Sequence, residues 1–264
     1  MRVGVFGAGG RMGATVCRAV ANDPDLDLVA AVDPHHAGLD VRQVTGADAK
    51  GVQVEGHADA LARADAQVAV DFTERAAAKA NLAWCAEHRV HAVVGTTGFT
   101  ATDLEEAGRL FPAGGGVNCF VAPNFAIGAV LMMRFAEMAA PFFDSAEIIE
   151  LHHDTKLDAP SGTAMLTAER MAAASDSWTP DPTTQEVVAG ARGGRGPGGI
   201  MMHSVRLRGL VAHQEVLLGT TGQSLTIRHD SYDRSSFMPG VILAIKSLAG
   251  RPGLTVGLDV LLGL

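Results

Sequence analysis

The sequence predicts an α/β protein built from a parallel sheet covered by helices and a smaller α+β domain with a mixed or antiparallel sheet. Three observations lead to this prediction. In the first half of the chain short apolar runs alternate with alanine-rich stretches, in the second half strands follow one another directly, and the pattern changes after Asn124. We expect the first domain at residues 1–125, with 235–264 returning to it, and the second at 126–234.

The elements of the first half are predicted from apolar runs without polar alternation. The expected strands lie at residues 2–6, 28–32, 68–72, 92–94 and 116–121. The expected helices lie at the alanine-rich segments 13–21, 76–88 and 101–110. Strands that are apolar on both sides are typical of a parallel sheet with both faces covered.

The second half begins with an apolar helix predicted at 127–139. Strands are expected at 146–152, 201–211, 215–218 and 225–229, and a last helix at 236–248. The Gly219-Thr220-Thr221-Gly222 stretch predicts a hairpin turn. The glycine- and arginine-rich segment 190–199 is interpreted as a mobile surface loop, in preference to an RNA or anion contact, because the chain is acidic.

Composition narrows the class of protein. The 264 residues carry 21 Lys and Arg against 29 Asp and Glu, a formal charge of −8, which argues against nucleic acid or anionic membrane as a partner. Cys17, Cys85 and Cys119 are widely spaced and lack a CxxC pair, so we expect reduced thiols. Neither a signal peptide nor a membrane-spanning apolar run is visible, and a cytoplasmic protein is expected.

A glycine-rich turn follows the first predicted strand and precedes a predicted helix. It reads Gly7-Ala8-Gly9-Gly10-Arg11-Met12-Gly13, which fits GxxGxxG and departs from GxGxxG. Such a turn lets the backbone approach a pyrophosphate, while the helix N-terminus offers free N–H groups. The sequence therefore predicts a Rossmann-like domain that binds a dinucleotide, although a plain tight turn is the alternative.

Three further segments at strand ends support this prediction. Asp33 follows the second strand, 20 residues after Gly13, where a carboxylate accepts hydrogen bonds from an adenosine ribose; it could instead be a turn residue before Pro34. Two turns follow later strands, and we interpret them as nicotinamide or ribose contacts. They are Gly95-Thr96-Thr97-Gly98 and Ala122-Pro123-Asn124-Phe125.

The candidate chemical site lies where a strand passes into a helix. The segment 150–164 contains His152, His153 and Lys156 and then a helix start at Pro160-Ser161-Gly162-Thr163. A histidine can exchange a proton near neutral pH, and a lysine beside free helix N–H groups suits a carboxylate. Adjacent histidines without a cysteine nearby disfavour a zinc site, and Pro-Ser-Gly is not the strained elbow of a serine nucleophile. Plain surface polarity is the remaining alternative.

This chemical block resembles the signature of the dihydrodipicolinate reductase (4-hydroxy-tetrahydrodipicolinate reductase) family. The resemblance rests on His152-His153, Lys156 and Asp158-Ala159-Pro160-Ser161-Gly162-Thr163-Ala164, and it extends to the glycine turn and the turns at Gly95 and Ala122. It covers essentially the whole chain and looks most similar to actinobacterial members. It implies an NAD(P)H-dependent reduction of a cyclic, unsaturated dicarboxylate on the route to diaminopimelate and lysine.

The resemblance also implies roles for single residues. His152 falls at the acid/base position and Lys156 at the group that polarises and protonates the substrate. Substrate contacts are implied for His153, Ser161, Gly162 and Thr163. Cofactor contacts are implied for Gly7, Ala8, Gly9, Gly10, Arg11, Met12, Asp33, Gly95, Thr96, Thr97, Ala122, Pro123, Asn124 and Phe125, and more loosely for Arg234. A homotetramer formed through the second domain, and closure of the two domains over the ligands, are implied as well.

One departure from the family pattern concerns the cofactor. Members that favour NADPH often have an arginine directly after the acidic residue, whereas Pro34 follows Asp33 here. His35, His36 or Arg11 could still contact a 2′-phosphate, so we expect both NADH and NADPH to serve, with NADH modestly preferred. Two rival functions remain: a related reductase of another cyclic imine or semialdehyde, and a non-catalytic NAD-sensing protein.

Overall fold

The computed structural model describes all residues, 1–264. The chain forms two compact units, one of residues 1–126 with 237–264 and the other of residues 127–236. Each has its own sheet, seven-stranded in the first unit and five-stranded in the second. None of the helices combines the length and the apolar content needed to cross a bilayer.

The first unit is built on a fully parallel sheet, whose strand order is β12-β6-β5-β4-β1-β2-β3. The strands are β1 (Arg2–Phe6), β2 (Asp27–Val32), β3 (Val54–Glu55), β4 (Val68–Asp71), β5 (His91–Val94), β6 (Cys119–Val121) and β12 (Leu254–Val256). Since they run in one direction, their carboxyl ends meet at one edge of the sheet, where open α/β sheets bind ligands.

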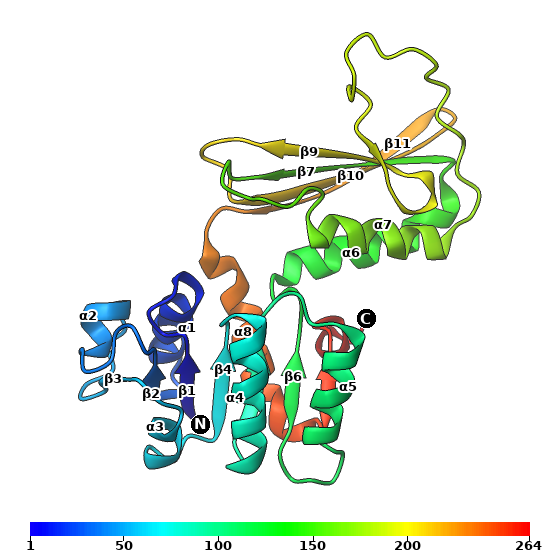
Figure 1. The fold of residues 1–264 in the computed structure, drawn as a ribbon. Helices are drawn as coiled ribbons and strands as arrows, with labels where there is room; N and C mark the ends of the chain where they lie inside the picture. Colours follow the sequence, from blue (N-terminus) through cyan, green and yellow to red (C-terminus); the bar gives the residue numbers. More distant parts are fainter. The chain divides into compact units, whose positions relative to one another are not determined.

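Helices cover this parallel sheet. They are α1 (Arg11–Asn22), α2 (Val41–Thr45), α3 (Asp59–Arg63), α4 (Arg75–Glu87), α5 (Ala101–Leu110), α8 (Met238–Ser247) and α9 (Asp259–Leu262). One core cluster joins α3, α4 and α5 to the sheet through residues such as Leu61, Leu82 and Ala107, while α1 packs against α8 (Figure 1). The free thiols of Cys17, Cys85 and Cys119 are buried, as expected for reduced cysteines.

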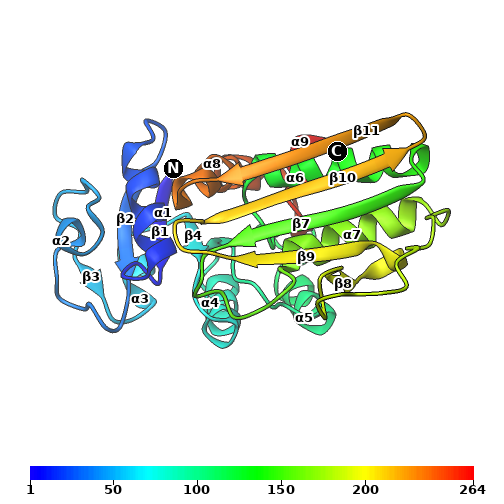
Figure 2. The ribbon, with the colours of Figure 1, turned by 90° about the horizontal axis from the view of Figure 1, so that it is seen from above.

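The second unit is a mixed sheet with helices on one face. Its strand order is β11-β10-β7-β9-β8, and β7 pairs with β9 in parallel and with β10 antiparallel. The elements are α6 (Ile127–Ala139), β7 (Ser145–His152), α7 (Gly162–Ala174), β8 (Gly194–Arg195), β9 (Met201–Arg206), β10 (Ala212–Thr220) and β11 (Gln223–Ser231). Helices α6 and α7 pack on the face that carries Ile148, Val216 and Leu218, and the other face is left open (Figures 1 and 2).

Most predicted elements are confirmed, and the exceptions have local causes. Helices 101–110 and 127–139 match α5 and α6. The start of α5 follows from a capping box, in which Asp103 N donates to Thr100 Oγ1 at 3.3 Å and Thr100 N donates to Asp103 Oδ2 at 2.7 Å. The predicted strand 201–211 is wrong beyond Arg206, because the chain turns at Gly209, whose φ of +90° interrupts extended backbone.

Three smaller predictions also need correction, and a fourth is narrowed. The strand expected at 116–121 begins only at Cys119, since Gly116 has a φ of +74°. The helix expected at 236–248 becomes α-helical only from Met238, after a 3₁₀ turn. The helix start predicted within Pro160-Ser161-Gly162-Thr163 is narrowed to Gly162, with Ser161 as the N-cap and Pro160 before the helix. The segment 190–199 is not entirely a loop, because Gly194–Arg195 forms the edge strand β8 against β9.

Candidate active site

The glycine turn after β1 has the geometry of a close backbone approach. Gly7 has a φ of +67°, and Gly10 N donates to Gly7 O at 3.0 Å. A Cβ added at Gly13 would lie 1.9 Å from Gly7 O, so only glycine allows α1 to start this close to the turn. Gly10 caps α1 without a side-chain hydrogen bond, and no acidic residue lies in the first turn. The first N–H groups of α1 therefore suit an anion.

Asp33 ties the glycine turn to the end of β2. Its Oδ2 accepts a hydrogen bond from Gly9 N at 2.9 Å, and its Oδ1 accepts one from His35 N at 3.0 Å and lies 3.0 Å from His36 Nδ1. Burial alone would raise the pKa of Asp33, but hydrogen bonds from His36, His35 and Gly9 outweigh it and lower that pKa. Asp33 is thus an ionised residue that holds the glycine turn against the end of β2.

The end of β4 contributes groups that sequence reasoning missed. Asp71 is 3% exposed and accepts hydrogen bonds from Thr73 N, Thr73 Oγ1 and Asn81 Nδ2 at 2.6–2.7 Å. Burial raises the pKa of Asp71 in spite of these bonds. The carboxyl group fixes the turn that follows β4, between the turns after β1 and β5 in the sheet order. The sequence signal that could have identified Asp71 is an acidic residue at the end of an otherwise apolar strand.

The two later turns lie at the same edge of this sheet. Gly95 leaves room for the ring of Phe72, whose Cε1 would lie 2.0 Å from a Cβ at that position. Thr96 is 6% exposed, and its Oγ1 donates to Thr73 O at 2.8 Å, whereas Thr97 is exposed. In the turn after β6, Ala122 and Phe125 are buried, Pro123 is exposed and Asn124 Oδ1 accepts from Ala126 N at 2.8 Å. Phe125 packs its ring on Phe72 and Phe120, so its side chain is a core group and only its backbone could contact a ligand.

In the second unit, the end of β7 brings together three charged or titratable side chains. Glu150 and His152 are two residues apart on β7, so their side chains lie on the same face of the strand. Arg206 is the register partner of His152 on β9. His152 Nδ1 is hydrogen-bonded to Glu150 Oε2. Arg206 Nη1 and Nη2 donate to the two Glu150 oxygens at 2.9 and 2.8 Å, a bidentate pair. Glu150 is 0% exposed.

The loop after β7 carries the predicted lysine. Lys156 Nζ lies 2.7 and 2.9 Å from the two carboxyl oxygens of Asp158, which lowers the pKa of Asp158. Lys156 N donates to His153 O at 3.2 Å, and His153 Nδ1 lies 2.8 Å from Thr155 Oγ1. Arg206 Nη2 also donates to Asp158 O at 2.6 Å. The loop that bears Lys156 is therefore tied to the carboxylate that contacts His152.

The loop ends at the N-terminus of α7. Ser161 is the N-cap residue, 4% exposed, and its Oγ accepts from Ala164 N at 3.2 Å. The Ser161 hydroxyl is thus engaged in the cap. A substrate contact through this side chain would have to coexist with the hydrogen bond from Ala164 N. Gly162 is exposed, and a Cβ there would meet no atom within 4 Å. Gly162 and Thr163 begin the helix, where backbone N–H groups suit a carboxylate.

The predicted residues thus fall into two groups. The cofactor set lies along the carboxyl edge of the parallel sheet in the first unit, and the chemical set lies between the end of β7 and the start of α7 in the second. Arg234 lies in neither set. It begins the 3₁₀ helix after β11, beside Asp233.

The sequence pointed to His152 and Lys156 but not to Glu150 and Arg206. Glu150 had a signal, because a carboxylate two residues before a histidine on a strand lies on the same face. Arg206 is 56 residues from Glu150 in the chain, and only the pairing of β7 with β9 brings it there.

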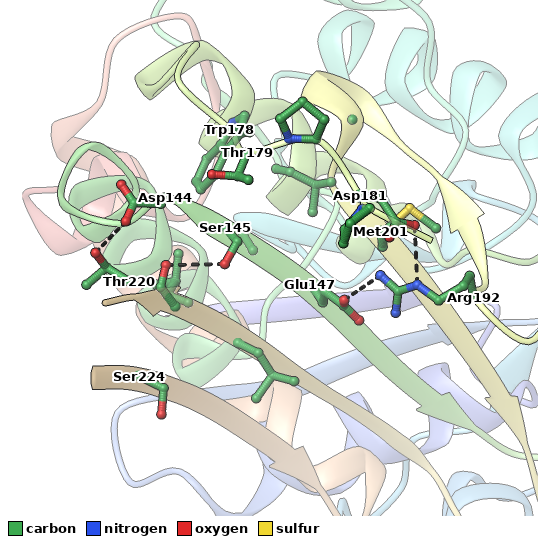
Figure 3. A pocket seen from close by; sticks show the side chains of 18 of the residues that line it. Asp144, Ser145, Glu147, Trp178, Thr179, Asp181, Arg192, Met201, Thr220 and Ser224 are labelled. Atoms are coloured by element: carbon green, nitrogen blue, oxygen red, sulfur yellow. Dashed lines mark hydrogen bonds and ion pairs between the residues drawn. The ribbon is translucent and has the colours of Figure 1, made fainter. Parts of the chain in front are cut away.

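A hollow of about 770 Å³ in the second unit lies away from these groups (Figure 3). It is lined by the first residues of β7, by the 178–182 segment and by the ends of β9, β10 and β11. Its charged groups are already paired, with Arg192 bonded to Glu147 at 2.8 Å and to Asp181 at 3.3 Å. Size alone does not make it the site of chemistry, because the proton-exchanging and cationic groups converge at the other end of β7.

Known proteins resemble the chain over its whole length. The model for the dihydrodipicolinate reductase N-terminus matches residues 1–125, and the model for its C-terminus matches residues 128–262. The chain is 50% identical to the 4-hydroxy-tetrahydrodipicolinate reductase of Nocardia farcinica, covering 100% of this chain and 99% of the relative. It is 49% identical to that of Mycobacterium marinum, covering 100% of both.

A solved structure agrees with the sequence comparison. The dipicolinate-bound dihydrodipicolinate reductase from Paenisporosarcina sp. TG-14 superimposes with a TM-score of 0.84 at 40% identity, covering 98% of each chain. An amine dehydrogenase from Mycobacterium smegmatis shares the fold, with a TM-score of 0.65 at 16% identity. The parallel sheet, the glycine turn and the His152–Lys156 block define an oxidoreductase of the class that uses a nicotinamide dinucleotide. Within that class, the chain belongs to the dihydrodipicolinate reductase family.

Proposed function

We propose that this protein reduces 4-hydroxy-tetrahydrodipicolinate to tetrahydrodipicolinate with NADH or NADPH, a step of diaminopimelate and lysine biosynthesis. One hydride and one proton are taken up, and the 4-hydroxyl group leaves as water. The observation that carries the proposal is the cluster at the end of β7. A histidine fixed by a buried carboxylate, a lysine four residues later and a helix start exposed at Gly162 occupy one short segment of a full-length family member. A cytoplasmic location suits a reductase that draws on the NAD(P)H pool.

The first unit fits the dinucleotide. Gly7, Gly9, Gly10 and Gly13 leave four positions of the turn without a side chain, and the uncapped N–H groups of α1 suit the pyrophosphate. Asp33 would accept from a ribose hydroxyl, and the turns 95–97 and 122–125 would contact the nicotinamide half. When bound, the reduced cofactor supplies the hydride.

The second unit supplies charge and protons. Lys156 would neutralise a substrate carboxylate and polarise the carbon–nitrogen double bond, while the N–H groups of Gly162 and Thr163 would bind a carboxylate. His152 would exchange the proton that the reduced ring needs. For Lys156 to do this it would leave Asp158, which is 62% exposed at its side chain and so holds the ammonium only weakly.

Cofactor choice would follow from Asp33. Its ionised carboxyl group favours a free 2′-hydroxyl and repels a 2′-phosphate, and Pro34 adds no positive charge. Arg11, His35 and His36 surround the same turn and would reduce the repulsion. We therefore propose dual use with a modest preference for NADH.

We further propose a homotetramer assembled through the open face of the second sheet. Strand alternation places Ile149 and Leu151 of β7, Val205 of β9 and Leu217 of β10 on that face, opposite the helix-covered one. Sedimentation equilibrium checks the state, and a monomer at micromolar concentration would contradict it.

The test of function is a coupled assay. The substrate is generated in place by condensing aspartate semialdehyde with pyruvate, and oxidation of NADH is followed by its absorbance. We expect oxidation only when both precursors and the condensing enzyme are present. Binding of NADH without turnover would favour the NAD-sensing alternative, and turnover with other cyclic imines alone would favour a related reductase.

A further inference from the structure

The strongest feature outside the predicted residues is the pair formed by Glu150 and Arg206. We infer that this pair is a positioning element of the reductase, which sets the tautomer of His152 and holds the loop that bears Lys156. The inference rests on the proposed function, since it concerns proton exchange by His152. Its two residues touch His152 and the loop backbone directly.

Glu150 is buried yet ionised. Burial alone would raise its pKa, but hydrogen bonds from His152, Arg206 and Ser204 outweigh it and lower the pKa to about 2. A guanidinium stays charged at any pH that a protein meets, and its fork matches both carboxyl oxygens. At neutral pH the Glu150 carboxyl group is therefore an acceptor only.

An acceptor-only partner decides where the proton of His152 lies. Because Glu150 Oε2 contacts Nδ1, that nitrogen carries hydrogen in both the neutral and the charged imidazole. Nε2 is then the only ring nitrogen left to exchange a proton with a substrate. Free histidine favours the other neutral tautomer, so the carboxylate reverses the ordinary preference.

Arg206 adds a second link. Its Nη2 donates both to Glu150 Oε1 at 2.8 Å and to Asp158 O at 2.6 Å. One guanidinium therefore joins the partner of His152 to the 153–161 loop, two residues from Lys156. A lysine at this position has no planar fork and would not make these contacts together.

The other face of β7 offers a matched control. Glu147 accepts from Arg192 Nη2 at 2.8 Å (Figure 3) and lies 2.8 Å from His203 Nε2, so like Glu150 it is paired with one arginine and one histidine. Its side chain is 34% exposed against 1% for Glu150, and neither of its partners belongs to the predicted site. If the sheet only required a charged cluster for its stability, Glu150→Gln and Glu147→Gln would have similar effects on activity.

The experiment compares four variants of the full chain with wild type: Glu150→Gln, Arg206→Lys, Glu147→Gln and His152→Gln. We expect Glu150→Gln to lower kcat about 10- to 100-fold with KM for substrate changed less than about 3-fold, since proton exchange is disturbed more than binding. Arg206→Lys should also raise the KM for substrate, because the 153–161 loop, which carries Lys156, loses its contact with Arg206. Glu147 lies on the face proposed for the tetramer, so the oligomeric state of Glu147→Gln is checked by sedimentation equilibrium; with the wild-type state retained, its kcat should stay within about 2-fold of wild type. Combining Glu150→Gln with His152→Gln should add little to His152→Gln alone.

A ¹⁵N NMR spectrum of the imidazole gives a readout independent of activity. For the neutral imidazole of wild type we expect the Nδ1–H tautomer, and for that of Glu150→Gln a mixture or the Nε2–H form. The Nε2–H tautomer in wild type would overturn the inference, even if the Glu150→Gln variant failed to fold.

The outcomes separate this inference from the proposed function. Full kcat in Glu150→Gln together with a strong loss in His152→Gln would overturn the positioning role and leave the function intact. Full kcat in both would remove His152 from the mechanism. An inactive wild type with correctly generated substrate would instead overturn the proposed function.

Discussion

The two candidate ligand sites differ in the groups they offer to a ligand: the first offers backbone N–H groups and the second offers side chains. The glycine turn of the first unit presents backbone N–H groups and depends on positions without a side chain, since a Cβ added at Gly13 would lie 1.9 Å from Gly7 O. The end of β7 presents side chains, and each is held by another charged group. The difference teaches that changes in the first region should act on packing and cofactor affinity, whereas changes in the second should act on the chemical step.

The largest effect on the chemical step is expected from a change at His152. His152→Gln should lower kcat by about 100-fold or more, with a much smaller change in KM, because proton exchange is lost while the binding groups remain. Steady-state kinetics at saturating cofactor measures it. His88→Gln serves as the control, because His88 is exposed in the first unit and stacks on Trp84. A His152→Gln variant with wild-type kcat would remove this residue from the mechanism.

Lys156→Ala should have the next largest effect. Loss of its charged contact should cost about 2–4 kcal/mol in transition-state binding, seen as a fall in kcat/KM. Lys79→Ala is a suitable control, because Lys79 pairs with Asp103 and Glu106 in the first unit. If Lys156→Ala weakened only the binding of nucleotide, its assignment to the substrate would be wrong.

On the backbone side, Gly13→Ala should destabilise the first unit. The new Cβ would meet backbone atoms of Gly7, so α1 must shift, at a cost of about 1–3 kcal/mol. Thermal unfolding and titration with NADH should both show a loss, while kcat at saturating NADH changes little. Gly108→Ala in α5 is the control, since its Cβ would meet only Leu254 at 3.8 Å. Equal behaviour of the two variants would contradict the close approach.

Acid should weaken the second unit through Glu150. Its pKa is lowered from 4.5 to about 2 in the fold, so its ionised form adds stability above the unfolded pKa, and this is lost as pH falls from 4.5 toward 2. Glu150→Gln should therefore cost on the order of 1 kcal/mol or more near neutral pH, and the difference from wild type should shrink in that acid range. Denaturant unfolding at several pH values measures it. A difference independent of pH would show that the ionised carboxylate adds no stability.

The smallest expected effect concerns the choice of cofactor. Asp33→Ser should shift selectivity toward NADPH by several-fold, at most about 1 kcal/mol, because solvent and salt screen the charges around a ribose. The ratio of kcat/KM for NADH and NADPH measures it. A strong native preference for NADPH, or unchanged selectivity in the variant, would contradict the ribose contact.

Much of the fold follows from local sequence signals. The capping box at Thr100 and Asp103 set the start of α5, and the Thr221–Gly222 turn set the β10–β11 hairpin. Short elements escaped prediction because they have little periodicity of their own. Strand β3 has two residues and β12 three, and both exist by pairing with a sheet already formed.

The sequence by itself determined the alternation of strands and helices, the glycine turn, and the presence of His152 and Lys156 in one segment, because each of these is a property of neighbouring residues. Only the tertiary structure decided which strands pair and which charges meet. Arg206 reaches Glu150 because β9 pairs in parallel with β7, and Asp33 reaches Gly9 because β2 pairs with β1. Pairing between distant strands depends on the burial of whole faces, which no short stretch of sequence encodes.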